Sequence, residues 1–62
     1  MTPSSEDIKL YDEARKAYKE KDLAKLKEIY QRLLDLDNAN PEIVYIVKRM
    51  IDELEAQQKA TA

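Results

Sequence analysis

The apolar residues of this chain recur at helical spacing in three separate stretches. Leu10, Ala14 and Ala17 share one side of a helix with Tyr11 and Tyr18, within an arc of about 120°. A second stripe runs over residues 23–36, and a third, about 160° wide, over residues 43–54. This period predicts three amphipathic helices.

Phase and capping residues set the predicted boundaries. Continuing the first helix through Asp22 would turn the second stripe away from the first by about 120°, so we expect a break at Lys21-Asp22, with Asp22 as an N-cap. Ser4 or Ser5 is the expected cap of the first helix. The predicted helices span about residues 5–20, 23–36 and 41–57, with fraying over 59–62.

One long helix over residues 5–36 is the alternative, because the segment around Lys21-Asp22 contains neither Gly nor Pro. Such a helix would bury its offset stripe only against another chain. The alternative therefore predicts a dimer.

The segment Pro-Glu-Ile-Val-Tyr-Ile-Val at 41–47 has the composition of a strand. Asn40 as N-cap and Pro41 at the first helical position nevertheless favour a helix start. The following apolar residues repeat at helical spacing, which assigns four of them to the core or to an interface: Ile43, Val44, Ile46 and Val47. Tyr45 is expected on the opposite side, beside Arg49 and Asp52.

These elements predict an all-α fold, a three-helix antiparallel bundle that forms a single domain over residues 1–62. A chain of 62 residues buries only a small core, and it contains no Cys or His that could add a disulfide or an imidazole-bound metal. We therefore expect no metal and no cofactor, with stability supplied by helix packing or self-association.

Residues 17–22 (Ala-Tyr-Lys-Glu-Lys-Asp) and 29–40 (Ile-Tyr-Gln-Arg-Leu-Leu-Asp-Leu-Asp-Asn-Ala-Asn) resemble the tetratricopeptide repeat (TPR), a helical hairpin with a characteristic exit turn. The resemblance covers about one and a half degenerate repeats. It implies a TPR-like hairpin followed by a third helix, and protein or peptide binding. The candidate partner-binding residues on this analogy are Tyr11, Arg15, Tyr18 and Tyr45. The residues alone favour a simpler interpretation of Tyr11 and Tyr18, as core residues with their hydroxyls at the edge.

Charge is uneven along the chain. Residues 15–27 hold six basic residues against Glu20 and Asp22, whereas the whole chain has a net charge of -2. This segment supports an alternative function, a small basic-faced binder of nucleic acid or another acidic partner, although a solvated helix face explains it as well and nucleic acid is not favoured. Reversing the charge of Lys16, Lys19 and Lys25 would then weaken binding.

No residue set indicates catalysis, because the chain has no Cys or His nucleophile or base and no Gly-rich phosphate loop. We therefore predict that it is not an enzyme. Asp35, Asp37 and Asn38 do not continue into a calcium loop, since Ala39 and Asn40 follow. No apolar run reaches the roughly 20 residues of a membrane span, so no membrane partner is expected.

The second and third helices offer more apolar surface than the first can cover, which predicts a homodimer or another protein partner. The sequence thus favours a non-catalytic helical scaffold or interaction module. Abundant helix formers and capping residues are also typical of a designed mini-protein, whereas the four tyrosines and the missing Gly caps are not. Both origins stay open, and a natural chain would be expected in the cytoplasm.

Overall fold

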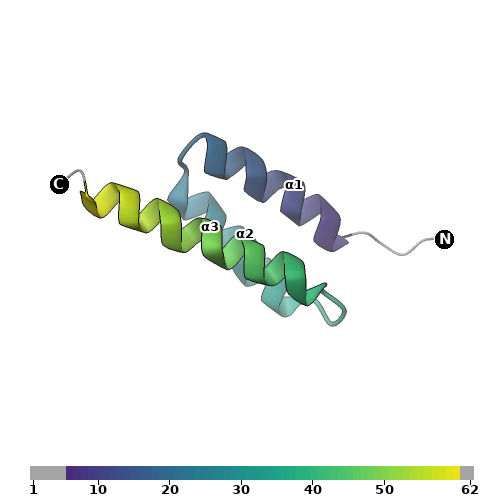
Figure 1. Ribbon diagram of the computed structural model, residues 1–62. Helices are drawn as coiled ribbons and strands as arrows, with labels where there is room; N and C mark the ends of the chain where they lie inside the picture. Colours follow the sequence, from purple (N-terminus) through teal and green to yellow (C-terminus); the bar gives the residue numbers. More distant parts are fainter. Residues whose placement is uncertain (1–5, 61–62) are drawn as a thin grey trace.

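The computed structural model describes residues 6–60, which form three helices: α1 (Glu6–Lys19), α2 (Leu23–Asp35) and α3 (Pro41–Ala60) (Figure 1). Each helix packs against both others, so the predicted three-helix bundle is confirmed. The predicted cap at Ser4 or Ser5 lies outside the described residues, as do Thr61 and Ala62.

The third helix is longer than predicted. It continues through Lys59 and Ala60, which were predicted to fray. Ala, Gln and Lys are good helix formers, and no Gly or Pro interrupts this stretch, so nothing local stops the helix at Gln57. α3 therefore extends two or three residues beyond the predicted end at about Gln57 or Gln58.

A tight turn separates α1 from α2, and the alternative of one long helix is therefore wrong. Lys21 adopts a left-handed backbone conformation, with φ of 58°. Its N–H donates to the Tyr18 carbonyl at 3.0 Å, and the Asp22 N–H donates to the Ala17 carbonyl at 2.8 Å. This pair of bonds is the Schellman C-cap, formed here with Lys at the position that Gly usually occupies.

Asp22 also begins α2. Its side chain accepts a hydrogen bond from the Lys25 N–H at 3.1 Å, and its carbonyl accepts one from the Leu26 N–H at 3.1 Å. The N-cap predicted from the sequence is confirmed. Asp22 therefore completes the C-cap of α1 and is also the N-cap of α2, and no further residue separates the two caps.

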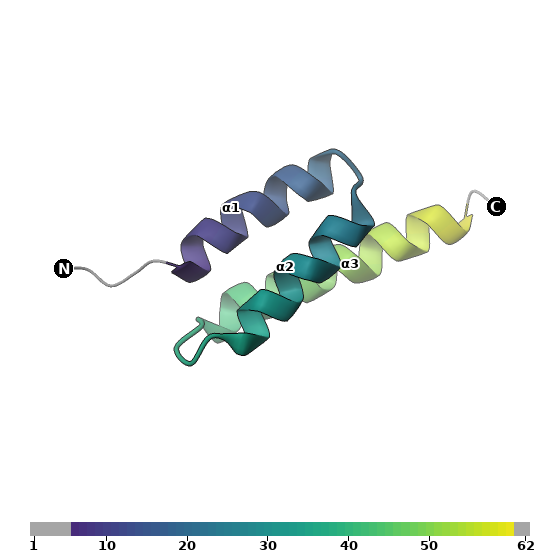
Figure 2. The ribbon, with the colours of Figure 1, turned by 180° about the vertical axis from the view of Figure 1, so that it is seen from behind.

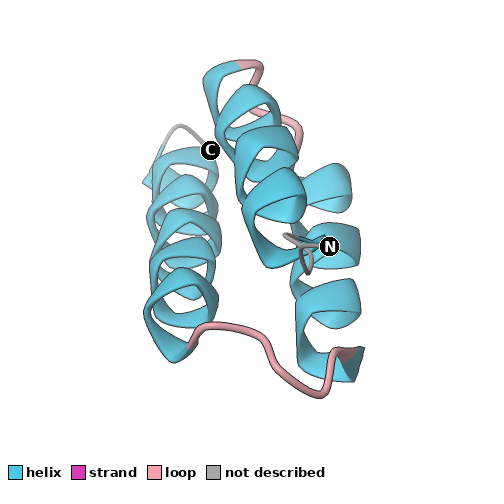
Figure 3. Cartoon of the chain, turned by 90° about the vertical axis from the view of Figure 1, so that its right-hand side faces the viewer, coloured by secondary structure: helices cyan, strands magenta, loops and turns pink. Residues whose placement is uncertain are grey.

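The connection between α2 and α3 ends in the second predicted cap. Asn40 Oδ1 accepts a hydrogen bond from the Glu42 N–H at 2.9 Å, and Pro41 occupies the first position of α3. Figure 3 shows this connection and the α1–α2 turn at opposite ends of the bundle. We call these ends the loop end, where α1 also begins, and the turn end.

The core lies along the axis shared by the three helices, with α2 packed along α3 when the bundle is viewed from behind (Figure 2). α1 contributes the small residues Ala14 and Ala17 beside Leu10, which lets its neighbours approach closely. The buried residues are Leu10, Ala14, Ala17, Leu26, Ile29, Leu33, Val47, Ile51 and Leu54.

The apolar stripes predicted for α2 and α3 are only partly covered. Val47 is buried and Ile43 and Val44 are half-buried, but Ile46 is 38% exposed and Leu34 is 51% exposed. An arc of about 160° is wider than two neighbouring helices cover here, so its margins remain in solvent.

Candidate functional site

Tyr18 lies between α1 and α3. Its side chain is half-buried, and its hydroxyl donates a hydrogen bond to Glu53 Oε1 at 3.1 Å. The bond raises the pKa of Tyr18 above its ordinary value of 10.0, because the Glu53 carboxylate favours the protonated phenol; partial desolvation acts in the same direction. Tyr18 therefore joins α1 to α3 in two ways: its ring packs against the core, and its hydroxyl binds Glu53.

Glu53 also binds the Arg49 side chain. Its Oε2 accepts from the Arg49 guanidinium at 3.4 Å, one turn earlier on α3. The neighbouring Tyr45 hydroxyl and, after it, Glu53 raise the pKa of Arg49 above its ordinary value. Tyr18, Glu53 and Arg49 thus form a connected polar chain across the surface between α1 and α3.

Tyr45 stands at the outer end of this chain. It is 62% exposed, as the sequence predicted from its position opposite the core. A hollow of about 280 Å³ runs beside it, and its lining residues are Tyr18, Tyr45, Ile46, Arg49, Met50 and Glu53. The structure therefore brings two of the four predicted partner-binding residues, Tyr18 and Tyr45, to one hollow.

The other two predicted residues pair with each other on α1. The Arg15 guanidinium carbon lies 5.9 Å from the centre of the Tyr11 ring, which is half-buried against the core. This separation is near the outer limit for a cation–π contact. Tyr11 and Arg15 do not line the hollow beside Tyr45.

Each helix has a large exposed apolar side chain toward the loop end. Among residues 6–60, the large apolar side chains that are exposed are Ile8, Leu34, Tyr45 and Ile46. Ile8 is near the start of α1, Leu34 near the end of α2, and the other two near the start of α3. The antiparallel arrangement places these three positions at the same end. Tyr45 lines one hollow with Leu34 and another with Ile46, whereas Ile8 lines neither. We call the four residues the loop-end apolar surface.

Sequence reasoning missed part of this surface. Ile8 was outside the predicted stripe of the first helix, and Leu34 and Ile46 were assigned to apolar stripes without a distinction between covered and uncovered margins. The signal for Glu53 was its spacing, since Tyr45, Arg49 and Glu53 follow one another at intervals of four residues and so share one side of α3.

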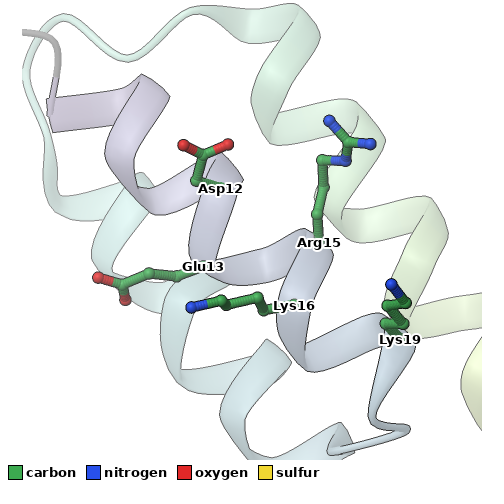
Figure 4. A pocket seen from close by; sticks show the side chains of 5 residues that line it. All are labelled: Asp12, Glu13, Arg15, Lys16 and Lys19. Carbon is green, nitrogen blue, oxygen red and sulfur yellow. The ribbon is translucent and has the colours of Figure 1, made fainter.

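The basic segment forms a surface of mixed charge. A shallow depression of about 400 Å³ lies over α1, and Figure 4 shows acidic and basic side chains together around it: Asp12, Glu13, Arg15, Lys16 and Lys19. All five come from one helix, so the depression has no second wall. Lys27, at the far end of the segment, binds Glu55 of α3 at 3.0 Å.

In the described part of the chain, no group of three or more His, Cys, Asp or Glu side chains is arranged to hold a metal ion. No helix within residues 6–60 is long and apolar enough to cross a membrane. Comparison with protein-family models, with curated proteins and with solved structures finds no match to this chain.

Proposed function

We propose that this chain is a non-catalytic helical scaffold that acts by protein–protein contact, and that it associates with itself. The observation that carries the proposal is the loop-end apolar surface, where all three helices contribute an exposed apolar side chain. Exposed apolar residues scattered singly are ordinary, whereas a group at one end of a small domain is typical of an interaction surface.

The polar groups support the same proposal. Arg and Tyr are enriched in protein interfaces, and Tyr45 and Arg49 lie together at the edge of the apolar residues. The TPR-like order of the helices, a hairpin followed by a third helix, is likewise consistent with a scaffold and is part of the proposal. A designed origin is compatible with it as well.

Sedimentation from low to high micromolar concentration tests self-association. We expect the average mass to rise with concentration, and the fluorescence of a hydrophobic dye to report exposed apolar surface. Leu34→Ser and Tyr45→Ser should reduce both signals. Ala24→Ser is the matched control, because Ala24 is an exposed apolar residue of α2 outside the loop-end apolar surface. A strictly monomeric chain that binds no dye would refute the proposal.

The alternative, a basic-faced binder of nucleic acid, receives less support. The acidic side chains among the bases of α1 and the Lys27–Glu55 ion pair reduce the positive field of the segment. Titration with nucleic acid at low salt tests it directly. If the alternative holds, reversing the charges of Lys16, Lys19 and Lys25 weakens binding and flattens its salt dependence.

A further inference from the structure

An apolar hollow lies between α2 and α3 at the loop end. Its volume is about 470 Å³, and its lining residues are Leu33, Leu34, Leu36, Asp37, Ala39, Pro41, Val44, Tyr45 and Lys48. We call it the α2–α3 groove. Leu34 and Tyr45, which are 51% and 62% exposed, belong to opposite helices of this groove, and buried Leu33 contributes to its lining.

The groove is short, since its lining residues extend only to Leu33 on α2 and Lys48 on α3. The α2–α3 connection closes one end. Toward the turn end, the Lys27 ammonium and the Glu55 carboxylate join α2 to α3 at 3.0 Å. An occupant therefore has to insert a few apolar side chains between these limits, and the groove does not continue along the whole bundle.

Charge distinguishes between occupants. Asp37 lies in the connection at one end of the groove, and Lys48 lies on α3, seven residues beyond its first residue and so about 10 Å along the helix. A uniformly basic or uniformly acidic peptide would match only one of the two charges. A second copy of the same chain, related by a twofold axis, presents Lys48 to Asp37 and Asp37 to Lys48, because residue i meets j and j meets i.

We propose that a second copy of this chain occupies the α2–α3 groove in a twofold dimer, with Asp37 of each copy beside Lys48 of the other. This inference rests on the proposed self-association and names its interface. Leu34 and Tyr45 then lie between the two charge pairs and cover each other across the axis. Specific interfaces commonly have an apolar centre flanked by complementary charges.

The present partner of Lys48 does not prevent this pairing. Its ammonium lies 3.8 Å from the Asp52 carboxylate one turn later on α3, and both side chains are more than half exposed. Exposed pairs at this spacing are weak, so Lys48 can turn to a second copy at little expense. The surface between α1 and α3 is less suited to a second copy, since Tyr18 and Arg49 each already bind Glu53 there.

Charge exchange tests the twofold arrangement. Asp37→Lys places Lys beside Lys48 at both pairs of the dimer, and Lys48→Asp places Asp beside Asp37. We expect each single variant to raise the dimer Kd at least about tenfold, as measured by sedimentation, because two like-charge pairs form. A mixture of the two single variants forms a heterodimer with Lys–Asp at both positions, and should recover the wild-type Kd. The double variant should recover it too.

Asp12→Lys and Lys9→Asp are the controls, since they change net charge by the same amounts on the exposed surface of α1. Circular dichroism of each variant confirms that the helices persist. If wild type dimerises but the single variants match these controls, or the mixture recovers nothing, the interface lies elsewhere and this inference is overturned while self-association stands. A monomeric wild type contradicts self-association itself.

Discussion

Asp7 and Asn40 are joined across the bundle although 33 positions separate them in sequence. The backbone N–H of Asn40 donates a hydrogen bond to Asp7 Oδ2 at 3.1 Å. Asn40 is the N-cap of α3, so this bond joins the first turn of α1 to the start of α3. The bond supports the loop end, where the exposed apolar side chains gather.

Asp7→Ala should lower the free energy of unfolding by about 1 kcal/mol, because it removes this hydrogen bond. Asp7→Asn should lose less, since its amide oxygen can still accept from the Asn40 N–H. Urea unfolding followed by circular dichroism measures both. Asp12→Ala, the same change on the exposed side of α1, is the control. Equal losses at Asp7 and Asp12 would contradict a specific role for the bond.

Lys21→Gly should stabilise the protein by about 0.5–1 kcal/mol. Lys21 has a positive φ of 58°, which is strained for a residue with a Cβ atom and unstrained for Gly. Lys21→Ala removes the same charge but keeps the Cβ atom, and it should bring no such gain. The comparison of the two midpoints in thermal unfolding separates backbone strain from charge. A stabilised Ala variant would attribute the effect to charge.

Leu26→Ala should destabilise the fold by about 2–5 kcal/mol, because the Leu26 side chain is fully buried. A domain of this size has a total stability on the order of 3–9 kcal/mol, so the variant loses a large fraction of it and should unfold at a much lower urea concentration. Leu34→Ala on the same helix should change stability by less than about 0.5 kcal/mol. It should instead weaken self-association. A large loss of stability at Leu34 would mean that this residue is part of the core.

The Tyr18 phenol should titrate above the ordinary tyrosine value, because Glu53 raises its pKa in the folded state. The raised pKa contributes stability that is fully present below pH 10 and is lost as the pH rises through the folded-state pKa. An NMR titration of the tyrosine ring carbons measures it. Glu53→Gln should lower the pKa of Tyr18 toward 10.0. The control is Glu28→Gln on α2, where Glu28 pairs with Arg32, and it should leave the pKa of Tyr18 unchanged. Identical titration of Tyr18 in both variants would refute the role of Glu53.

Local chemistry explains why the helix boundaries could be predicted. The stripes on either side of Asp22 are out of phase, and Asn40 and Pro41 each have a residue-specific reason to begin a helix. The left-handed conformation of Lys21 could not be predicted in this way, because no Gly marks it. It arises from the tertiary requirement that α2 fold back onto α1.

Contacts between helices could not be predicted from the sequence, because they depend on how each helix is rotated about its axis. Spacing alone offers Lys59 as a partner for Glu55, yet Glu55 binds Lys27 on another helix. Tyr18 was recognised as a candidate binding residue, but its bond to Glu53 spans 35 positions. The exposure of Tyr45 was predictable, since one residue opposite a wide apolar arc has no helix left to cover it.

Asp22 is the last residue of the C-cap of α1 and also the N-cap of α2, so the two caps share this residue. Opening the last turn of α1 displaces Asp22 and releases the Lys25 amide at the same moment. Hydrogen exchange should therefore give the same free energy of opening for the Asp22 and Lys25 amides, and the turn end should open as one cooperative unit.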